Sequence, residues 1–142
     1  MKCIIFLIGI FLSCLVYSDE RKLQNISQLV WENRVILIYP DDEVNLEKIN
    51  YEVLFKKFNN EIKERDIIWF IIKDKKVFTN YPNTLSNDFI VNTKNKYQIE
   101  KYKILLIGKD GGVKAKGKDL NLEMLFEKVD AMPMRRQEIN SK

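Results

Sequence analysis

The chain contains no histidine, and its two cysteines, Cys3 and Cys14, both lie within the first 18 of its 142 residues. Without histidine, a common general base and metal ligand of proteins is missing. If the first 18 residues are removed on export, the rest of the chain has no thiol. That excludes a disulfide, a cysteine nucleophile and a metal site built on cysteine. We therefore predict no catalytic residue, no metal site and no cofactor.

The first 18 residues have the layout of a secretory signal peptide. Lys2 supplies a short positive region, residues 3–16 are apolar and uncharged, and Val16-Tyr17-Ser18 fits a cleavage site. The apolar run is short for a membrane span. We predict an exported protein, in the periplasm, the cell envelope or the extracellular space, with a mature chain of residues 19–142. A lipoprotein signal at Cys14 and an uncleaved anchor are the alternatives.

Proline and glycine are scarce, with three and five residues, and no linker rich in them interrupts residues 19–142. This length without a linker predicts a single domain. Charge is unevenly placed: residues 19–100 hold 13 basic and 14 acidic side chains, whereas residues 101–142 hold 10 basic and 6 acidic ones. The basic surplus therefore belongs to the C-terminal third of the chain.

Three apolar runs have the length of strands, at residues 35–39, 67–72 and 104–107. Because they are continuous rather than alternating, we expect strands buried on both faces of a sheet. Residues 46–63 between the first two runs have helical spacing, with Asp41 or Asp42 as a cap. A strand, a helix and a second buried strand predict a right-handed crossover.

The third run leads into a predicted hairpin turn at Asp110-Gly111. Its partner strand, residues 113–118, places three lysines on one face, and a helix over 121–129 follows. A long connector, residues 73–103, carries one predicted helix that starts near Ser86. This order predicts an α/β fold, a thioredoxin-like three-layer sandwich with a central mixed sheet of about four strands and flanking helices.

Five short motifs together resemble the DUF4174 family. They are Trp31…Asn33-Arg34, Tyr39-Pro40, Glu64-Arg65-Asp66, residues 108–114 and residues 130–138. The resemblance spans about residues 26–138 and implies a thioredoxin- or peroxiredoxin-like fold in an exported setting. Similar domains occur in extracellular sushi-repeat-containing proteins and in the secreted coiled-coil domain-containing protein 80. The resemblance implies no particular activity and supplies no catalytic residues.

Three segments each allow a structural and a functional interpretation. Pro40-Asp41-Asp42-Glu43 stands where redox members of the thioredoxin fold carry the attacking cysteine; its acids can cap a helix or bind a cation. Residues 108–112 form a tight hairpin or a phosphate-binding nest of backbone N–H groups. Met132-Pro133-Met134 ends the last helix on the core or forms a partner-binding surface.

The basic surplus predicts a candidate binding surface. Its residues are Lys109, Asp110, Lys114, Lys116, Lys118, Arg135 and Arg136. If the two arginines fold back toward the hairpin, the shared positive potential should attract an anionic glycan, an anionic lipid headgroup or an envelope or extracellular protein. Nucleic acid is not expected, because no recognition motif is present. The alternative is that the lysines only protect an edge strand from aggregation.

These observations favour a binding or interaction module without catalysis over an enzyme. The enzyme alternative is a hydrolase or transferase that uses Asp41, Asp42 or Glu43 near Lys109. A redox-family relic that acts with a cysteine-bearing partner is the third hypothesis. A deep pocket joining the acidic loop to the hairpin would favour the enzyme, and a flat basic face would favour the binding module.

Overall fold

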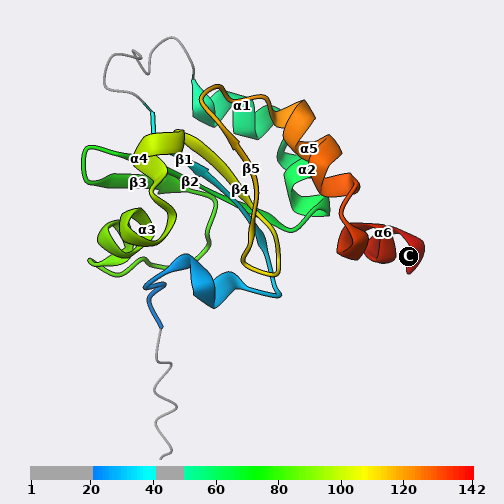
Figure 1. The fold of residues 1–142 in the computed structure, drawn as a ribbon, viewed down its shortest axis with the longest axis horizontal. Coiled ribbons are helices and arrows are strands. Elements are labelled where there is room, and N and C mark those ends of the chain that lie inside the picture. The colour runs from blue at the N-terminus through cyan, green and yellow to red at the C-terminus, as the bar shows by residue number, and fades with distance from the viewer. Residues whose placement is uncertain (1–20, 41–49) are drawn as a thin grey trace, which may run out of the picture.

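A mixed sheet covered by helices on both faces makes up the computed structural model, which describes residues 21–40 and 50–142 (Figure 1). The strand order within these residues is β3-β2-β1-β4-β5. The strands are β1 (Arg34–Ile38), β2 (Ile67–Lys73), β3 (Lys76–Thr79), β4 (Ile104–Ile107) and β5 (Val113–Gly117). The helices are η1 (Ile26–Leu29), α1 (Tyr51–Lys57), α2 (Asn59–Glu64), α3 (Phe89–Tyr97), α4 (Ile99–Tyr102), α5 (Leu122–Asp130) and α6 (Pro133–Asn140).

Strand β1 lies at the centre of the sheet. It pairs in parallel with β2 and antiparallel with β4, and two hairpins add β3 and β5 at the edges. Every residue of β1 and β4 is buried, as their continuous apolar runs require. The predicted α/β, thioredoxin-like sandwich is confirmed, with five strands rather than the expected four.

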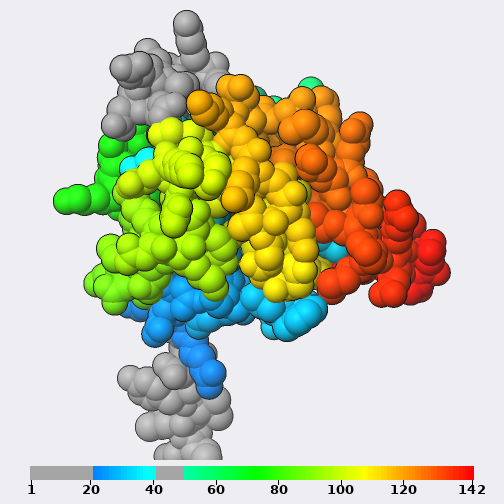
Figure 2. Space-filling view, in the orientation of Figure 1, coloured from blue at the N-terminus to red at the C-terminus, as the bar shows by residue number. Residues whose placement is uncertain are grey.

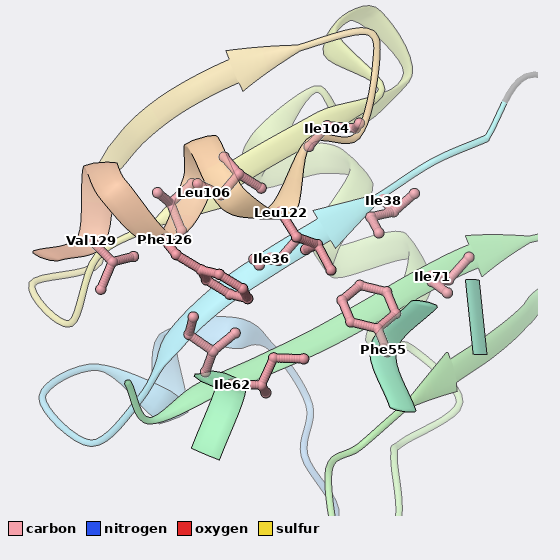
Figure 3. Packing of buried hydrophobic residues seen from close by; sticks show 12 residues of the cluster. Ile36, Ile38, Phe55, Ile62, Ile71, Ile104, Leu106, Leu122, Phe126 and Val129 are labelled. Carbon is pink, nitrogen blue, oxygen red and sulfur yellow. The ribbon is translucent and has the colours of Figure 1, made fainter. Parts of the chain in front are cut away.

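The two faces of the sheet carry separate cores, because alternate residues of each strand point to opposite sides. On one side Ile36 and Ile38 pack with α1, α2 and α5 (Figure 3). On the other side Val35 and Leu37 pack with η1, α3 and α4. We call these sides the α5 face and the α3 face. Within the described residues, no helix is long and apolar enough to cross a membrane.

Strand β3 was not predicted, since the connector over residues 73–103 was assigned one helix only. The four residues of β3 are exposed or half-buried, so they lack the apolar run that marks β1 and β4. Its turn, Asp74-Lys75, has two residues with positive φ, 48° and 65°, the conformation of a tight two-residue hairpin. The helix expected near Ser86 is α3, which begins at Phe89, and α4 follows it.

The helices flanking β2 and β5 differ from prediction in their ends. In the described part of the helix predicted over 46–63, Asn50 accepts a capping bond from Val53 N, and Phe58 divides the segment into α1 and α2. Asp41 and Asp42, the predicted caps, lie outside the described residues. The predicted helix over 121–129 is α5. Pro133 does not end the helical region. It occupies the first turn of a further helix, α6, where its missing N–H costs nothing.

A β-bulge in β5 separates the lysines that were predicted to share one face. Ile107 pairs with Val113, but Leu106 pairs with Ala115, so Lys114 is an extra residue in the strand. Lys114 lines a groove with residues of α5, whereas Lys116 lies over the Tyr102 ring, at 4.3 Å, on the α3 face. The alternation that the sequence suggested therefore fails at the bulge.

Candidate functional site

Four of the five sequence motifs meet at the end of the sheet where β1 begins. Their charged residues form one set of contacts that we call the ion-pair cluster. Its cations are Arg34, Arg65, Lys109 and Arg135, and its carboxylates are Glu64, Asp66, Asp130 and Glu138. The most distant partners in sequence, Arg34 and Glu138, are 104 residues apart. The cluster therefore exists only because the fold brings the motifs together.

Glu138 on α6 is the centre of one half of the cluster. Arg34, whose side chain is 1% exposed, donates from Nη1 and Nη2 to the two carboxylate oxygens of Glu138, each at 3.2 Å. Lys109 Nζ donates to Glu138 Oε1 and to Asp66 Oδ2, both at 2.8 Å. The carboxylate of Glu138 thus accepts from two cations that come from β1 and from the end of β4.

These contacts fix the charge of both groups. Burial alone would raise the pKa of Glu138, but the hydrogen bonds from Lys109 and Arg34 outweigh it and bring the pKa to about 2. Burial would lower the pKa of Lys109, but its bonds to Asp66 and Glu138 raise it instead. At neutral pH the carboxylate stays ionised and the ammonium stays protonated.

Asp130, the last residue of α5, is the centre of the other half. Arg65 binds it with two parallel bonds, from Nη2 at 2.7 Å and from Nε at 3.0 Å. Arg135 donates from Nε to the same carboxylate at 3.3 Å and from Nη2 to Glu64 at 2.8 Å. Although burial opposes it, the bonds from Arg65 and Arg135 lower the pKa of Asp130. Arg135 is 2% exposed, so it is not available to a surface ligand.

A groove of about 520 Å³ opens beside the cluster, between the β4–β5 hairpin and the junction of α5 with α6. It is lined by Arg34, Gly108, Lys109, Asp110, Lys114, Lys128, Ala131, Met132, Pro133 and Met134. Figure 2 shows the hollow between the yellow hairpin and the orange to red helices. One wall is polar and comes from the hairpin, and the other is largely apolar and comes from residues 131–134.

The hairpin loop leaves few backbone donors for a ligand. Gly108 N donates to Gly112 O at 2.9 Å, Gly111 N to Gly108 O at 3.0 Å, and Gly112 N to Asp110 Oδ1 at 3.0 Å. Asp110 also pairs with Lys114 at 2.6 Å, and this hydrogen bond lowers the pKa of Asp110. The loop geometry therefore favours the tight hairpin over the phosphate-binding nest.

The structure divides the seven predicted binding residues among several places. Lys109, Asp110 and Lys114 line the groove, and Arg135 is buried in the cluster beside it. The other three are exposed elsewhere: Lys116 on the α3 face, Lys118 just after β5 and Arg136 on α6. The structure therefore does not bring the seven residues onto one surface, because Arg135 is buried in the ion pairs and the bulge directs Lys114 away from Lys116.

Asp41, Asp42 and Glu43 lie outside the described residues. Lys109 contacts Glu138, which also binds Arg34, the first residue of β1. In residues 21–40 and 50–142 no group of three histidine, cysteine or acidic side chains could hold a metal ion.

Arg34, Arg65 and Glu138 belong to the sequence motifs, but their pairing was not predicted, and Lys128 was not among the predicted binding residues. The signal was present, because three of the motifs combine a basic and an acidic residue. What the sequence did not contain was the partner of each charge.

Comparison with known proteins gives one result. The family model described as a domain of unknown function, DUF4174, matches residues 25–138. Searches of curated proteins and of solved structures found no significant match. The matched range runs from Asn25, which caps η1, to Glu138, so it includes the whole ion-pair cluster and every residue that lines the groove.

Proposed function

We propose that this chain, which belongs to the DUF4174 family, is an exported binding module without catalytic activity, and that the groove beside the ion-pair cluster holds its ligand. The observation that carries the proposal is that Arg34 and Lys109 belong both to the cluster and to the groove wall. The same ion pairs that attach α6 to the sheet therefore hold the groove in shape, and a binding site on a fixed frame loses little entropy when it is occupied.

The lining of the groove suits an extended segment of a partner protein. Met132 and Met134 offer flexible apolar surface that adapts to different side chains. Lys128 makes no ion pair or hydrogen bond through its side chain within the described residues, so its charge is available to an acidic side chain of the partner. Ala131 and Pro133 are exposed, which indicates an open groove rather than an enclosed cavity for a small molecule.

The enzyme alternative receives less support from the same geometry. A general acid or base needs a pKa near the working pH. The pKa of Glu138 is about 2 and that of Lys109 is raised, so neither exchanges a proton readily at pH 7. The acids of this alternative, Asp41, Asp42 and Glu43, lie outside the described residues.

The experiment compares two methionine substitutions on neighbouring helices. The chain of residues 19–142 is immobilised as wild type, as Met134→Glu and as Met124→Glu, and each is exposed to the exported proteins of its own source. Met134 lines the groove, whereas Met124 is 45% exposed on α5 outside it. Proteins captured by the wild type are identified by mass spectrometry, and their affinities are then measured with purified material.

We expect Met134→Glu to abolish the capture of a specific protein that Met124→Glu retains, and calorimetry with a peptide from that protein to reproduce the difference. If both variants capture the same proteins with the same affinities as the wild type, the groove is not the binding site. Circular dichroism of all three chains establishes that they are equally folded.

A further inference from the structure

A second cationic area lies on the α3 face, away from the groove. Tyr39, just after β1, is contacted by two lysines: Lys94 Nζ is 4.7 Å from the centre of its ring, and Lys103 Nζ is 5.4 Å from it. Lys94 also donates to the Tyr39 hydroxyl at 3.1 Å, and Tyr39 N donates to Lys103 O at 2.7 Å. Both lysines are therefore held in place by the same tyrosine.

The same arrangement repeats next to it. Tyr102, at the end of α4, has Lys101 Nζ at 5.2 Å and Lys116 Nζ at 4.3 Å from the centre of its ring. The backbone of Lys103 forms an isolated β-bridge with Gly117, next to the β4–β5 pair. This bridge connects the two tyrosines and their lysines. Lys118 follows directly and is exposed. We call Tyr39, Tyr102 and these five lysines the lysine–tyrosine surface.

Few carboxylates of the described part oppose this charge. Glu100 pairs with Lys94 at 2.9 Å, and Asp119 follows Lys118 in the chain. Three of the five lysines make no ion pair with any described residue: Lys101, Lys116 and Lys118. They are exposed, so their charges face solvent and raise the local potential at low ionic strength.

We propose that the lysine–tyrosine surface binds an acidic polysaccharide through the repeated sulfate or carboxylate groups of the extended chain. The successive contacts from Lys94 through Lys103 to Lys116 describe a strip rather than a pocket, which matches a linear polyanion. Lysine ammonium groups act as point charges, so recognition depends on charge density more than on one fixed geometry.

A membrane surface fits less well, because peripheral attachment uses apolar side chains beside the cations. The large apolar side chains that are exposed in the described part are Trp31, Val53, Phe78, Val91, Val113, Met124 and Ile139. None of them belongs to the lysine–tyrosine surface.

The choice of a polysaccharide over a nucleic acid rests on the proposed export of the chain. The choice of this surface does not depend on the groove, since the two lie on opposite faces of the sheet.

The test uses heparin, a sulfated polysaccharide, as the probe and three chains of residues 19–142. One is the wild type, one carries Lys101→Gln, Lys116→Gln and Lys118→Gln, and the matched control carries Lys63→Gln, Lys75→Gln and Lys76→Gln. The control lysines are exposed and lie on α2 and the β2–β3 hairpin, so both variants lose the same net charge.

We expect the wild type to bind heparin at about 0.01 M salt, where the Debye length is about 30 Å, and to weaken steeply toward about 0.15 M. The surface variant should bind about tenfold or more weakly, and the control variant should stay within about twofold of the wild type. Vesicles of phosphatidylcholine with phosphatidylglycerol and a single-stranded oligonucleotide serve as competing probes.

Three results would overturn the proposal: no retention of the wild type at low salt, equal losses in the two variants, or tighter binding to vesicles or to the oligonucleotide than to heparin. None of these outcomes bears on the groove, because Lys101, Lys116 and Lys118 are not among its lining residues. Equal thermal melting of the three chains establishes that a loss of binding is not a loss of folding.

Discussion

Replacing Glu138 by glutamine should remove the central acceptor of the ion-pair cluster while keeping the shape of the side chain. The fall in the pKa of Glu138 from its ordinary value of 4.5 to about 2 corresponds to about 3 kcal/mol of stability at pH 7. The side chain is 25% exposed, which lowers this figure somewhat through solvent screening. Against that, the variant leaves the buried Arg34 without its carboxylate, a change that typically costs about 3–5 kcal/mol. We expect a loss of about 3 kcal/mol.

Urea unfolding of the chain of residues 19–142 at pH 7, followed by circular dichroism, measures this loss. The matched control is Glu127→Gln, since Glu127 is exposed on α5 and its carboxylate makes no hydrogen bond or ion pair within the described residues. Exposed substitutions of this kind change stability by about 0.5 kcal/mol or less. If Glu138→Gln costs less than about 1 kcal/mol, the cluster does not hold α6 and the reasoning is wrong.

The same contacts predict the dependence on pH. Because folding lowers the pKa of Glu138, its contribution is fully present above the ordinary value of 4.5 and is lost as the pH falls toward about 2. The difference in unfolding free energy between the wild type and Glu138→Gln should therefore disappear as the pH falls from about 5 to about 2. A stability difference between the two chains that stays constant over this range would contradict the assigned pKa of Glu138.

Three further predictions concern processing and the backbone. Mass spectrometry of the exported form should find Asp19 or a neighbouring residue at the N-terminus, and a lipid-modified Cys14 there would show the lipoprotein alternative instead. Asn80→Ala should lower the free energy of unfolding by about 1–2 kcal/mol in a thermal melt, because the Asn80 side chain accepts from Trp69 N at 2.8 Å and donates to Ile67 O at 3.1 Å. Asn83→Ala, at an exposed position, is the control. Gly111→Ala should lower stability by about 1 kcal/mol in the same assay, because Gly111 has φ +79°; an unchanged melting temperature would show that the loop relaxes.

The elements that could be predicted from the sequence are those whose buried residues form a recognisable apolar pattern. β1, the buried part of β2 and β4 are continuous apolar runs, and α5 presents apolar residues at helical spacing. β3 was missed because a short edge strand buries little. α6 was missed for a different reason: its buried residue is Arg135, so the helix docks through charge and carries no apolar stripe.

The candidate site could be predicted only in its parts. The motifs named most of the charged residues, but the pairing of Arg34 with Glu138 depends on the crossover that places β1 at the centre and on the turn at Pro133 that returns α6 to the start of β1. The bulge at Lys114 has no clear mark in a strand whose lysines alternate regularly. In both cases the decisive information is the three-dimensional neighbour, which spacing along the chain does not contain.

The way α6 is attached also bears on how the groove works. An apolar stripe would let α6 pack against different hydrophobic surfaces, and a shift of α6 would change the groove, because Pro133 and Met134 of this helix line it. Ion pairs need the partner at one position and one orientation, and buried charges without partners are costly. Arg135 reaches Glu64 and Asp130 only where α6 now lies, while Glu138 reaches Arg34 and Lys109. We infer that the ion-pair cluster specifies the placement of α6 and so keeps the groove open.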